Sequence, residues 1–199
     1  MKNRKNILIK ALFIIAAFLT FNAVQAQTYK VFLNDSGTAA DSADASSFLL
    51  QTQLADTLWE VKIYGTDNLP KSFISYKDPY LIMPHGDFAY FKKVYPSARS
   101  NTSDTLNYIE NRGKFFNGQR DGVWVYYYST EKPSLILTYD KGKLNGPYEE
   151  LYRETNSTFL KGDYVNDRRE GEWKYFDETG KLYKIEHYKR GKVKKTENF

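Results

Sequence analysis

A sequence repeat of about 24 residues fills the second half of the chain, and it restricts the fold more than any other feature. The segments Gly122-Val123-Trp124, Gly146-Pro147-Tyr148 and Gly171-Glu172-Trp173 recur at intervals of 24 and 25 residues. An aromatic residue stands seven positions before each of these glycines, and a turn-forming residue stands four positions before it. A truncated fourth copy begins at Tyr188. Agreement at several positions predicts that each unit folds in the same way.

Each unit has the pattern of a β-hairpin. Asn117-Gly118 is a turn dipeptide, because glycine accepts a positive φ without steric cost. The flanking residues alternate, so that Trp124, Tyr126 and Tyr128 would share one face of a strand. A lone hairpin is not stable in water, and we therefore expect consecutive hairpins to extend one elongated antiparallel sheet.

The glycine two positions before each ring, at 122, 146 and 171, needs its own explanation. We expect it to make room for a neighbouring ring that lies over the backbone. Close approach of a ligand to the backbone is the alternative.

The pattern Tyr-x-x-Gly-x-x-x-Gly-x-Trp-x-x-Tyr resembles the variant MORN repeat of bacterial proteins, a family often labelled antitoxin-like. The residues that carry the resemblance best are Tyr139, Gly142, Gly146 and Tyr148 in one copy and Tyr164, Gly171, Trp173, Tyr175 and Phe176 in the next. It covers roughly residues 107–195 and departs from the pattern at Asp167, Pro147 and Tyr148. The resemblance implies a sheet of hairpins that serves interaction or scaffolding rather than chemistry.

The first 26 residues have the three-part pattern of a secretory signal peptide. A positively charged start precedes an uncharged, mostly apolar run over Ala11–Phe21, and small residues precede a cut expected between Ala26 and Gln27. The apolar run is shorter than the roughly 20 residues that a transmembrane helix needs. We therefore expect an exported protein, periplasmic or extracellular after cleavage, with an uncleaved anchor as the alternative.

Cleavage would also change the net charge. Residues 1–26 hold four of the 29 basic residues and none of the 24 acidic ones, so the remainder carries a net charge of +1. A charge this small gives no general attraction to nucleic acid. The lysine-rich residues 181–195 are a local exception, for which we expect a solvated edge strand. Contact of this basic tail with a membrane is the alternative.

The N-terminal half is less regular. We expect a strand over Tyr29–Leu33, a loop, and a short helix over Ser47–Leu58. Trp59, Val61 and Ile63 alternate as a strand, with which Phe73–Tyr76 would pair across a turn. Gly86–Phe91 has the pattern of a degenerate earlier copy, followed by a polar connector at Tyr95–Thr105. The expected division is a signal peptide (1–26), an N-terminal β-rich cap (27–106) and a repeat sheet (107–199).

Candidate catalytic residues are few. The chain has no cysteine and two histidines, which excludes disulfides and thiolate chemistry. His85 near Asp78 is the one acid–base candidate, and a turn histidine is the favoured interpretation. We expect His187 to be a solvated edge residue, and the adjacent Glu149 and Glu150 to point to opposite faces of a strand. The polar residues near 163–170 do not have the spacing of a calcium loop. We therefore expect no enzyme activity, no cofactor and no metal.

The aromatic rings are the remaining functional candidates. Aromatic area left uncovered by a single-layer sheet would bind a partner, a protein or alternatively a glycan. Packing of the rings on one another is the competing interpretation. The sequence thus predicts an exported, non-catalytic binding or scaffolding module, with an antitoxin-like inhibitor of a toxin as the alternative, and it indicates no oligomeric state. The candidate ligand-binding rings are Trp124, Tyr126, Tyr128, Tyr148, Tyr152, Trp173 and Tyr175.

Overall fold

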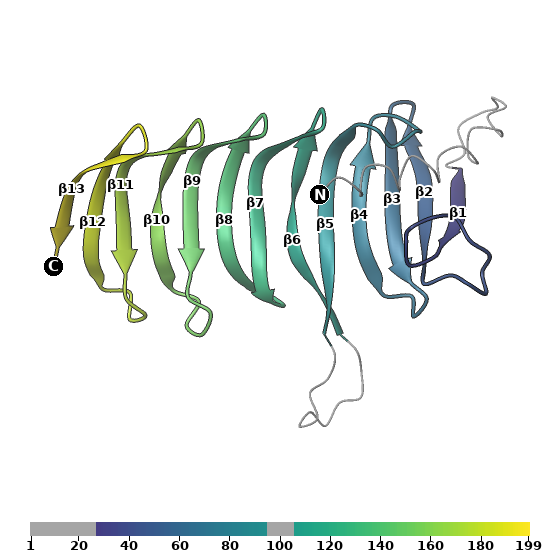
Figure 1. The fold of residues 1–199 in the computed structure, drawn as a ribbon, viewed down its shortest axis with the longest axis horizontal. Coiled ribbons are helices and arrows are strands. Elements are labelled where there is room, and N and C mark those ends of the chain that lie inside the picture. The colour runs from purple at the N-terminus through teal and green to yellow at the C-terminus, as the bar shows by residue number, and fades with distance from the viewer. Residues whose placement is uncertain (1–26, 95–105) are drawn as a thin grey trace, which may run out of the picture.

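The protein is a single antiparallel sheet of 13 strands, seen in a computed structural model that describes residues 27–94 and 106–199. Figure 1 shows the strands side by side in sequence order, so that every strand pairs with the one before it and the one after it. The predicted mainly-β fold of repeated hairpins is therefore confirmed. No helix long and apolar enough to cross a membrane occurs in this part of the chain. The expected signal peptide and the Tyr95–Thr105 connector lie outside the described residues.

The strands divide into an N-terminal group of five and a repeat group of eight, joined in the same sheet through the β5–β6 pairing. The first group is β1 (Thr28–Leu33), β2 (Ser47–Ala55), β3 (Leu58–Gly65), β4 (Pro70–Tyr76) and β5 (Pro84–Val94). The second group is β6 (Leu106–Phe116), β7 (Gln119–Ser129), β8 (Lys132–Asp140), β9 (Lys143–Leu151), β10 (Thr158–Val165), β11 (Arg168–Phe176), β12 (Leu182–Lys189) and β13 (Lys192–Asn198).

The β6–β7, β8–β9, β10–β11 and β12–β13 hairpins are closed by two-residue turns that lie along the same side of the sheet, at the top of Figure 1. Asn117 and Gly118 have φ angles of 48° and 80°. Positive φ at both central residues is the type I′ geometry, whose twist matches that of the flanking strands. The turns at 141–142, 166–167 and 190–191 repeat it, which confirms the turn assignments made from the dipeptides.

A second contact joins each of these turns to the preceding unit. The amide of Gly142 donates to the carbonyl of Arg120 at 2.8 Å, and the amide of Gly191 donates to that of Arg169 at 2.9 Å. Gly118 donates in the same way to Pro84, at 2.8 Å. The repeat geometry therefore extends back to β5, where Gly86 has a φ of 99° and starts the segment Gly86–Phe91. We call this turn-to-strand contact the joint.

The expected helix over Ser47–Leu58 is wrong, because this segment forms β2, a turn and the start of β3. The apolar run Phe48-Leu49-Leu50 resembles a helix segment in sequence, but it places apolar side chains on both faces of a strand. Leu49 is buried in the N-terminal core, while Phe48 points the other way and stacks on Tyr64 with ring centroids 5.3 Å apart. The strand at Tyr29–Leu33 and the pairing of Val61 with Ile74 agree with the sequence analysis.

The N-terminal core lies on one face of β1–β4. Its buried members are Leu33, Leu49, Trp59, Val61, Tyr76 and Leu81. Leu81 comes from the loop between β4 and β5, which crosses this face and accepts a hydrogen bond at Pro79 O from the Gln51 side-chain amide, 3.1 Å away. This loop covers the face at the N-terminal end only.

Candidate functional site

One face of the repeat sheet, called here the ring face, carries the row of residues that cross the strands at the level of Trp124. The row runs through Phe88, Gly113, Trp124, Leu137, Tyr148, Gly162, Trp173 and Glu186 on β5 to β12. Trp124 and Trp173 are 1% and 0% exposed. In a single-layer sheet, this burial comes from neighbouring side chains on the same face.

Glycines on the adjacent strand make room for both indoles. A Cβ atom built on Gly162 would lie 2.5 Å from Trp173 Cδ2, and one on Gly113 would lie 2.4 Å from Trp124 Cδ2. Each indole N–H then donates to the carbonyl that follows its glycine, as Trp173 does to Asp163 at 3.2 Å. The ring therefore lies against bare backbone and satisfies its own polar group.

The role expected for the glycines at 122 and 171 is wrong. A Cβ atom at Gly122 or Gly171 would have no neighbour within 4 Å. Their φ angles of 66° and 69° explain the residue type instead, because an L side chain is strained there. At Gly146, with φ 120°, an added Cβ would approach Thr138 at 3.3 Å rather than a ring, so the expected role is wrong there too.

An arginine covers the outer surface of each indole. The Arg169 guanidinium lies 4.0 Å from the Trp173 ring centroid and donates to the hydroxyls of Tyr175 and Tyr188 at 3.3 and 3.2 Å. Arg120 repeats the arrangement over Trp124 at 4.4 Å, with Tyr126 and Tyr139 as its acceptors. Guanidinium over indole is a favourable cation–π pair, and its hydrogen bonds fix the tyrosines around it.

The middle unit is built differently. Leu144 takes the place of the arginines, Tyr148 that of the tryptophans, and Leu137 that of the glycines. Tyr148 packs against Tyr164 and Trp173 with centroids 5.5 and 5.2 Å apart. Burial, with a smaller effect from Glu150, raises the pKa of Tyr148 to about 12. The arginine–tryptophan clusters therefore recur only in every second unit.

The structure brings all seven sequence-predicted rings to the ring face. The two tryptophans are enclosed, whereas Tyr126, Tyr128, Tyr148, Tyr152 and Tyr175 are half-buried and keep accessible ring area. Two of the hydroxyls are engaged in hydrogen bonds to the next unit, Tyr128 with Leu151 O at 3.0 Å and Tyr152 with Phe176 O at 2.9 Å. These two tyrosines therefore present ring surface, rather than free hydroxyls, on this face.

A run of four rings, called here the tyrosine strip, extends across β9 to β12. It consists of Tyr152, Phe159, Tyr175 and Tyr183, with successive centroids 5.2, 6.4 and 6.3 Å apart. Tyr183 is 38% exposed. Sequence alternation missed Phe159 and Tyr183, because the strand register shifts next to both residues.

A polar network borders the tyrosine strip. Glu186 accepts hydrogen bonds from the hydroxyls of Tyr175 at 2.6 Å and Tyr188 at 2.9 Å, and Lys184 Nζ lies 3.1 Å from its other oxygen. The hydrogen bond from Tyr175 lowers the pKa of Glu186. Lys184 Nζ also lies 3.7 Å from the Tyr175 ring centroid. This end of the ring face thus combines aromatic surface with paired charges.

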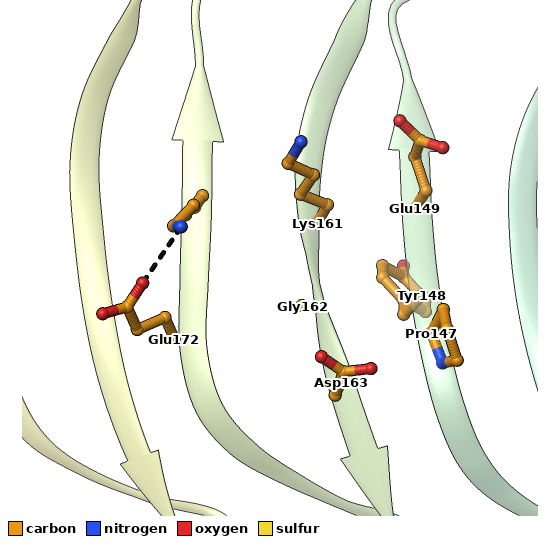
Figure 2. Close-up of a pocket in the computed structure, with 8 residues that line it drawn as sticks. Pro147, Tyr148, Glu149, Lys161, Gly162, Asp163 and Glu172 are labelled. Carbon is orange, nitrogen blue, oxygen red and sulfur yellow. Dashed lines mark ion pairs between the residues drawn. The ribbon is translucent and has the colours of Figure 1, made fainter.

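The opposite face of β9–β11 holds a shallow hollow of about 420 Å³, shown in Figure 2. Its side chains are mostly charged and include Glu149, Lys161 and Asp163, with Lys174 and Glu172 paired at 3.0 Å. Glu149 lies here, while Glu150 lies on the ring face beside Tyr148, so the expected separation of the two glutamates is confirmed. Among the described residues, no three His, Asp or Glu side chains gather as metal ligands would.

The two histidines take up structural contacts. His85 lies at the start of β5 rather than in a turn, and its Nδ1 accepts a hydrogen bond from the Asn117 amide at 3.4 Å. The carboxylate of Asp78 instead accepts from the amides of Ile82 and Met83. His187 is half-buried on β12, one strand in from β13, and pairs with Glu197 at 2.7 Å, so its placement as an edge residue is wrong.

Comparison with known proteins identifies one segment of the chain. A family model described as the MORN repeat variant matches residues 169–190. No curated protein matches the chain.

Residues 169–190 are a MORN repeat variant.

This MORN repeat contains one complete arginine–tryptophan cluster, from Arg169 through Trp173 and Tyr175 to Tyr188. It also contains Glu186 and half of the tyrosine strip. The earlier units share its type I′ turns and joints. A MORN repeat in a hairpin sheet is consistent with a repeat-based binding or scaffolding module, and such architecture is typically non-catalytic.

Proposed function

We propose that this protein is an exported, non-catalytic module that binds a protein partner through the half-exposed tyrosines of the ring face. The observation that carries the proposal is the tyrosine strip with its bordering Glu186 and Lys184. Aromatic residues supply large contact area at low entropic cost, and paired charges beside them add specificity. The repeat sheet holds these groups in a fixed arrangement.

The difference in exposure between the indoles and the tyrosines of the ring face supports binding rather than a purely structural role. The enclosed indoles already provide the core of each cluster, so burial of Tyr175 and Tyr183 is not needed to complete it. Half-exposed rings supported from beneath by a rigid layer are typical of contact surfaces. A glycan that stacks on the same rings is the second candidate ligand.

The antitoxin-like alternative gains no support from either the fold or the comparisons. The export part of the proposal depends on the sequence pattern of residues 1–26. It is tested separately, by fractionating cells that express the full chain and sequencing the N-terminus of the product. A product that begins at Gln27 outside the cytoplasm supports export, and an uncleaved cytoplasmic product contradicts it.

Site-specific photo-crosslinking tests the binding face directly. A benzoylphenylalanine placed at Tyr175 reports on the ring face, and one placed at the neighbouring Phe176 reports on the opposite face of the same strand, where Lys161 lies over the ring at 5.3 Å. Tyr126 and Tyr127 on β7 form a second matched pair. We expect one discrete crosslinked protein from positions 126 and 175, and none from 127 and 176.

Equal crosslinking from both faces, or none from either face, would contradict a ring-face protein interface. The glycan candidate is examined by adding soluble β-linked oligosaccharides to the wild-type chain and to Tyr183→Ser and following tyrosine fluorescence. Saturable quenching that is lost in Tyr183→Ser, without any crosslinked protein, would replace the protein partner with a glycan.

A further inference from the structure

The joints between units contain a second hydrogen bond, made by a side chain. In each hairpin, the backbone N–H of the first turn residue donates to the side chain of the residue that follows the joint carbonyl. The three bonds with oxygen acceptors are Lys141 to Asp121 Oδ1 at 3.4 Å, Asn166 to Asn145 Oδ1 at 3.4 Å, and Arg190 to Glu170 Oε2 at 2.6 Å. In the first unit the donor is Asn117 and the acceptor is Nδ1 of His85, at 3.4 Å. Four different residues therefore fill one structural position.

His85 differs from the other three acceptors in its chemistry. Carboxylate and amide oxygens accept hydrogen bonds throughout the neutral and mildly acidic range. An imidazole nitrogen accepts only while it carries no proton, and histidine gains that proton just below neutral pH. Among the four described side-chain hydrogen bonds at the joints, the bond to His85 is thus the one whose acceptor is lost on mild acidification.

The charges around His85 oppose its protonation. Lys77, from the loop after β4, donates to Asn117 Oδ1 at 2.6 Å and lies over the Phe116 ring. The Phe116 ring contacts the imidazole, with centroids 5.1 Å apart. Burial, followed by the charge of Lys77, lowers the pKa of His85 from 6.5, against a smaller opposite effect of the Asn117 side chain.

The nearby carboxylates are already engaged. Asp78 accepts the amides of its own loop, and Asp87 on β5 pairs with Lys114 on β6 at 3.5 Å. No described carboxylate is bonded to the His85 ring in place of the Asn117 amide. A protonated imidazole would therefore be repelled by the charge of Lys77 and would have no carboxylate bonded to it in compensation.

We propose that His85 is a pH-sensitive joint between the N-terminal strands and the repeat hairpins, closed at neutral pH and opened by protonation in mild acid. Because the folded state favours the neutral ring, the joint stabilises the fold at pH values above 6.5. That contribution is lost as the pH falls from 6.5 through the lower pKa of the folded state. The proposal does not depend on ring-face binding.

Hydrogen–deuterium exchange of the processed chain tests the joint. The measured quantity is the protection factor of Asn117 and Gly118 at about pH 7.5 and about pH 5, which bracket the histidine range. We expect the factor to fall about fivefold in mild acid, as the loss of one weak hydrogen bond predicts. The turn at 141–142, with Asp121 as acceptor, serves as the internal control and should not change.

Two substitutions use the structural equivalence of position 85 and position 145. His85→Asn copies the acceptor of the Asn145 joint and should abolish the fall in protection at Asn117. Asn145→His should create a new pH-dependent loss of protection at Asn166, the donor of that joint. Equal pH dependence in the wild-type chain and His85→Asn would overturn the proposal, as would a His85 pKa at or above 6.5 measured by NMR titration.

Discussion

The indole of Trp173 lies against the backbone of Gly162 on the neighbouring strand, where a Cβ atom would come within 2.5 Å of the ring. The same relationship joins Trp124 to Gly113. In the unit between them, the smaller Tyr148 pairs with Leu137. The larger ring thus lies on the smaller partner and the smaller ring on the larger one, which keeps the ring face filled without a second layer.

This relationship predicts that Gly162→Ala destabilises the fold by about 1–3 kcal/mol, because the new methyl group displaces an enclosed indole. Urea unfolding followed by tryptophan fluorescence measures the loss. Gly171→Ala is the matched control, with a positive φ and no neighbour in the way. Its cost is backbone strain of about 1 kcal/mol, and the Trp173 emission should stay unchanged. A shift of the emission maximum in Gly171→Ala rather than Gly162→Ala would contradict this assignment.

Arg169→Lys should cost about 1–2 kcal/mol, since an ammonium group cannot both stack on Trp173 and reach two tyrosine hydroxyls. Thermal unfolding followed by circular dichroism gives the difference. The adjacent Arg168 is exposed, and Arg168→Lys is therefore expected to have no measurable effect. Equal losses in the two variants would show that the cluster contributes nothing specific.

Lys141→Asn should stabilise the chain by about 0.5 kcal/mol. Lys141 holds a φ of 47° at the first position of a type I′ turn, where asparagine is better tolerated than lysine. Its amide hydrogen bond to Asp121 does not involve the side chain that is replaced. Chemical denaturation compares the two chains, and a destabilised Lys141→Asn would contradict the turn assignment.

Stability should fall in acid partly through Glu186. The hydrogen bond from Tyr175 lowers the pKa of Glu186 below 4.5, so the charged carboxylate stabilises the fold above that pH. The contribution is lost as the pH drops from 4.5 through the lower folded pKa. Glu186→Gln should therefore flatten the acid limb of a plot of stability against pH. The exposed Glu172→Gln, on the opposite face, serves as the control, and an identical flattening there would remove Glu186 as the cause.

Much of the fold was predictable because its determinants are local. Turn dipeptides such as Asn117-Gly118 define the hairpins by backbone sterics alone, and strand alternation then sends Trp124 and Trp173 to the same face. The segment at 47–58 was mispredicted because Phe48 and Leu50 are apolar on the face opposite Leu49. The alternation of apolar and polar residues that marks a strand is absent when both faces carry apolar side chains.

The site residues that the sequence analysis missed are brought into place by contacts between strands. Arg120 and Arg169 occupy equivalent positions 49 residues apart, a spacing twice that of the repeat, and a search at the single period overlooks them. Phe159 and Tyr183 reach the ring face through register shifts, which reverse the expected alternation. The role of His85 appears only once a turn 32 residues later lies beside it.

The central claim is that stacked hairpins place each tryptophan on a glycine of the adjacent strand. NMR of the processed chain tests it most directly, through the α-proton shifts of Gly113 and Gly162 and their nuclear Overhauser contacts to indole protons. We expect both glycines to be shifted strongly upfield by the ring current, with contacts to Trp124 and Trp173 respectively. Glycine α-protons at ordinary shifts, without contacts to either indole, would contradict the account.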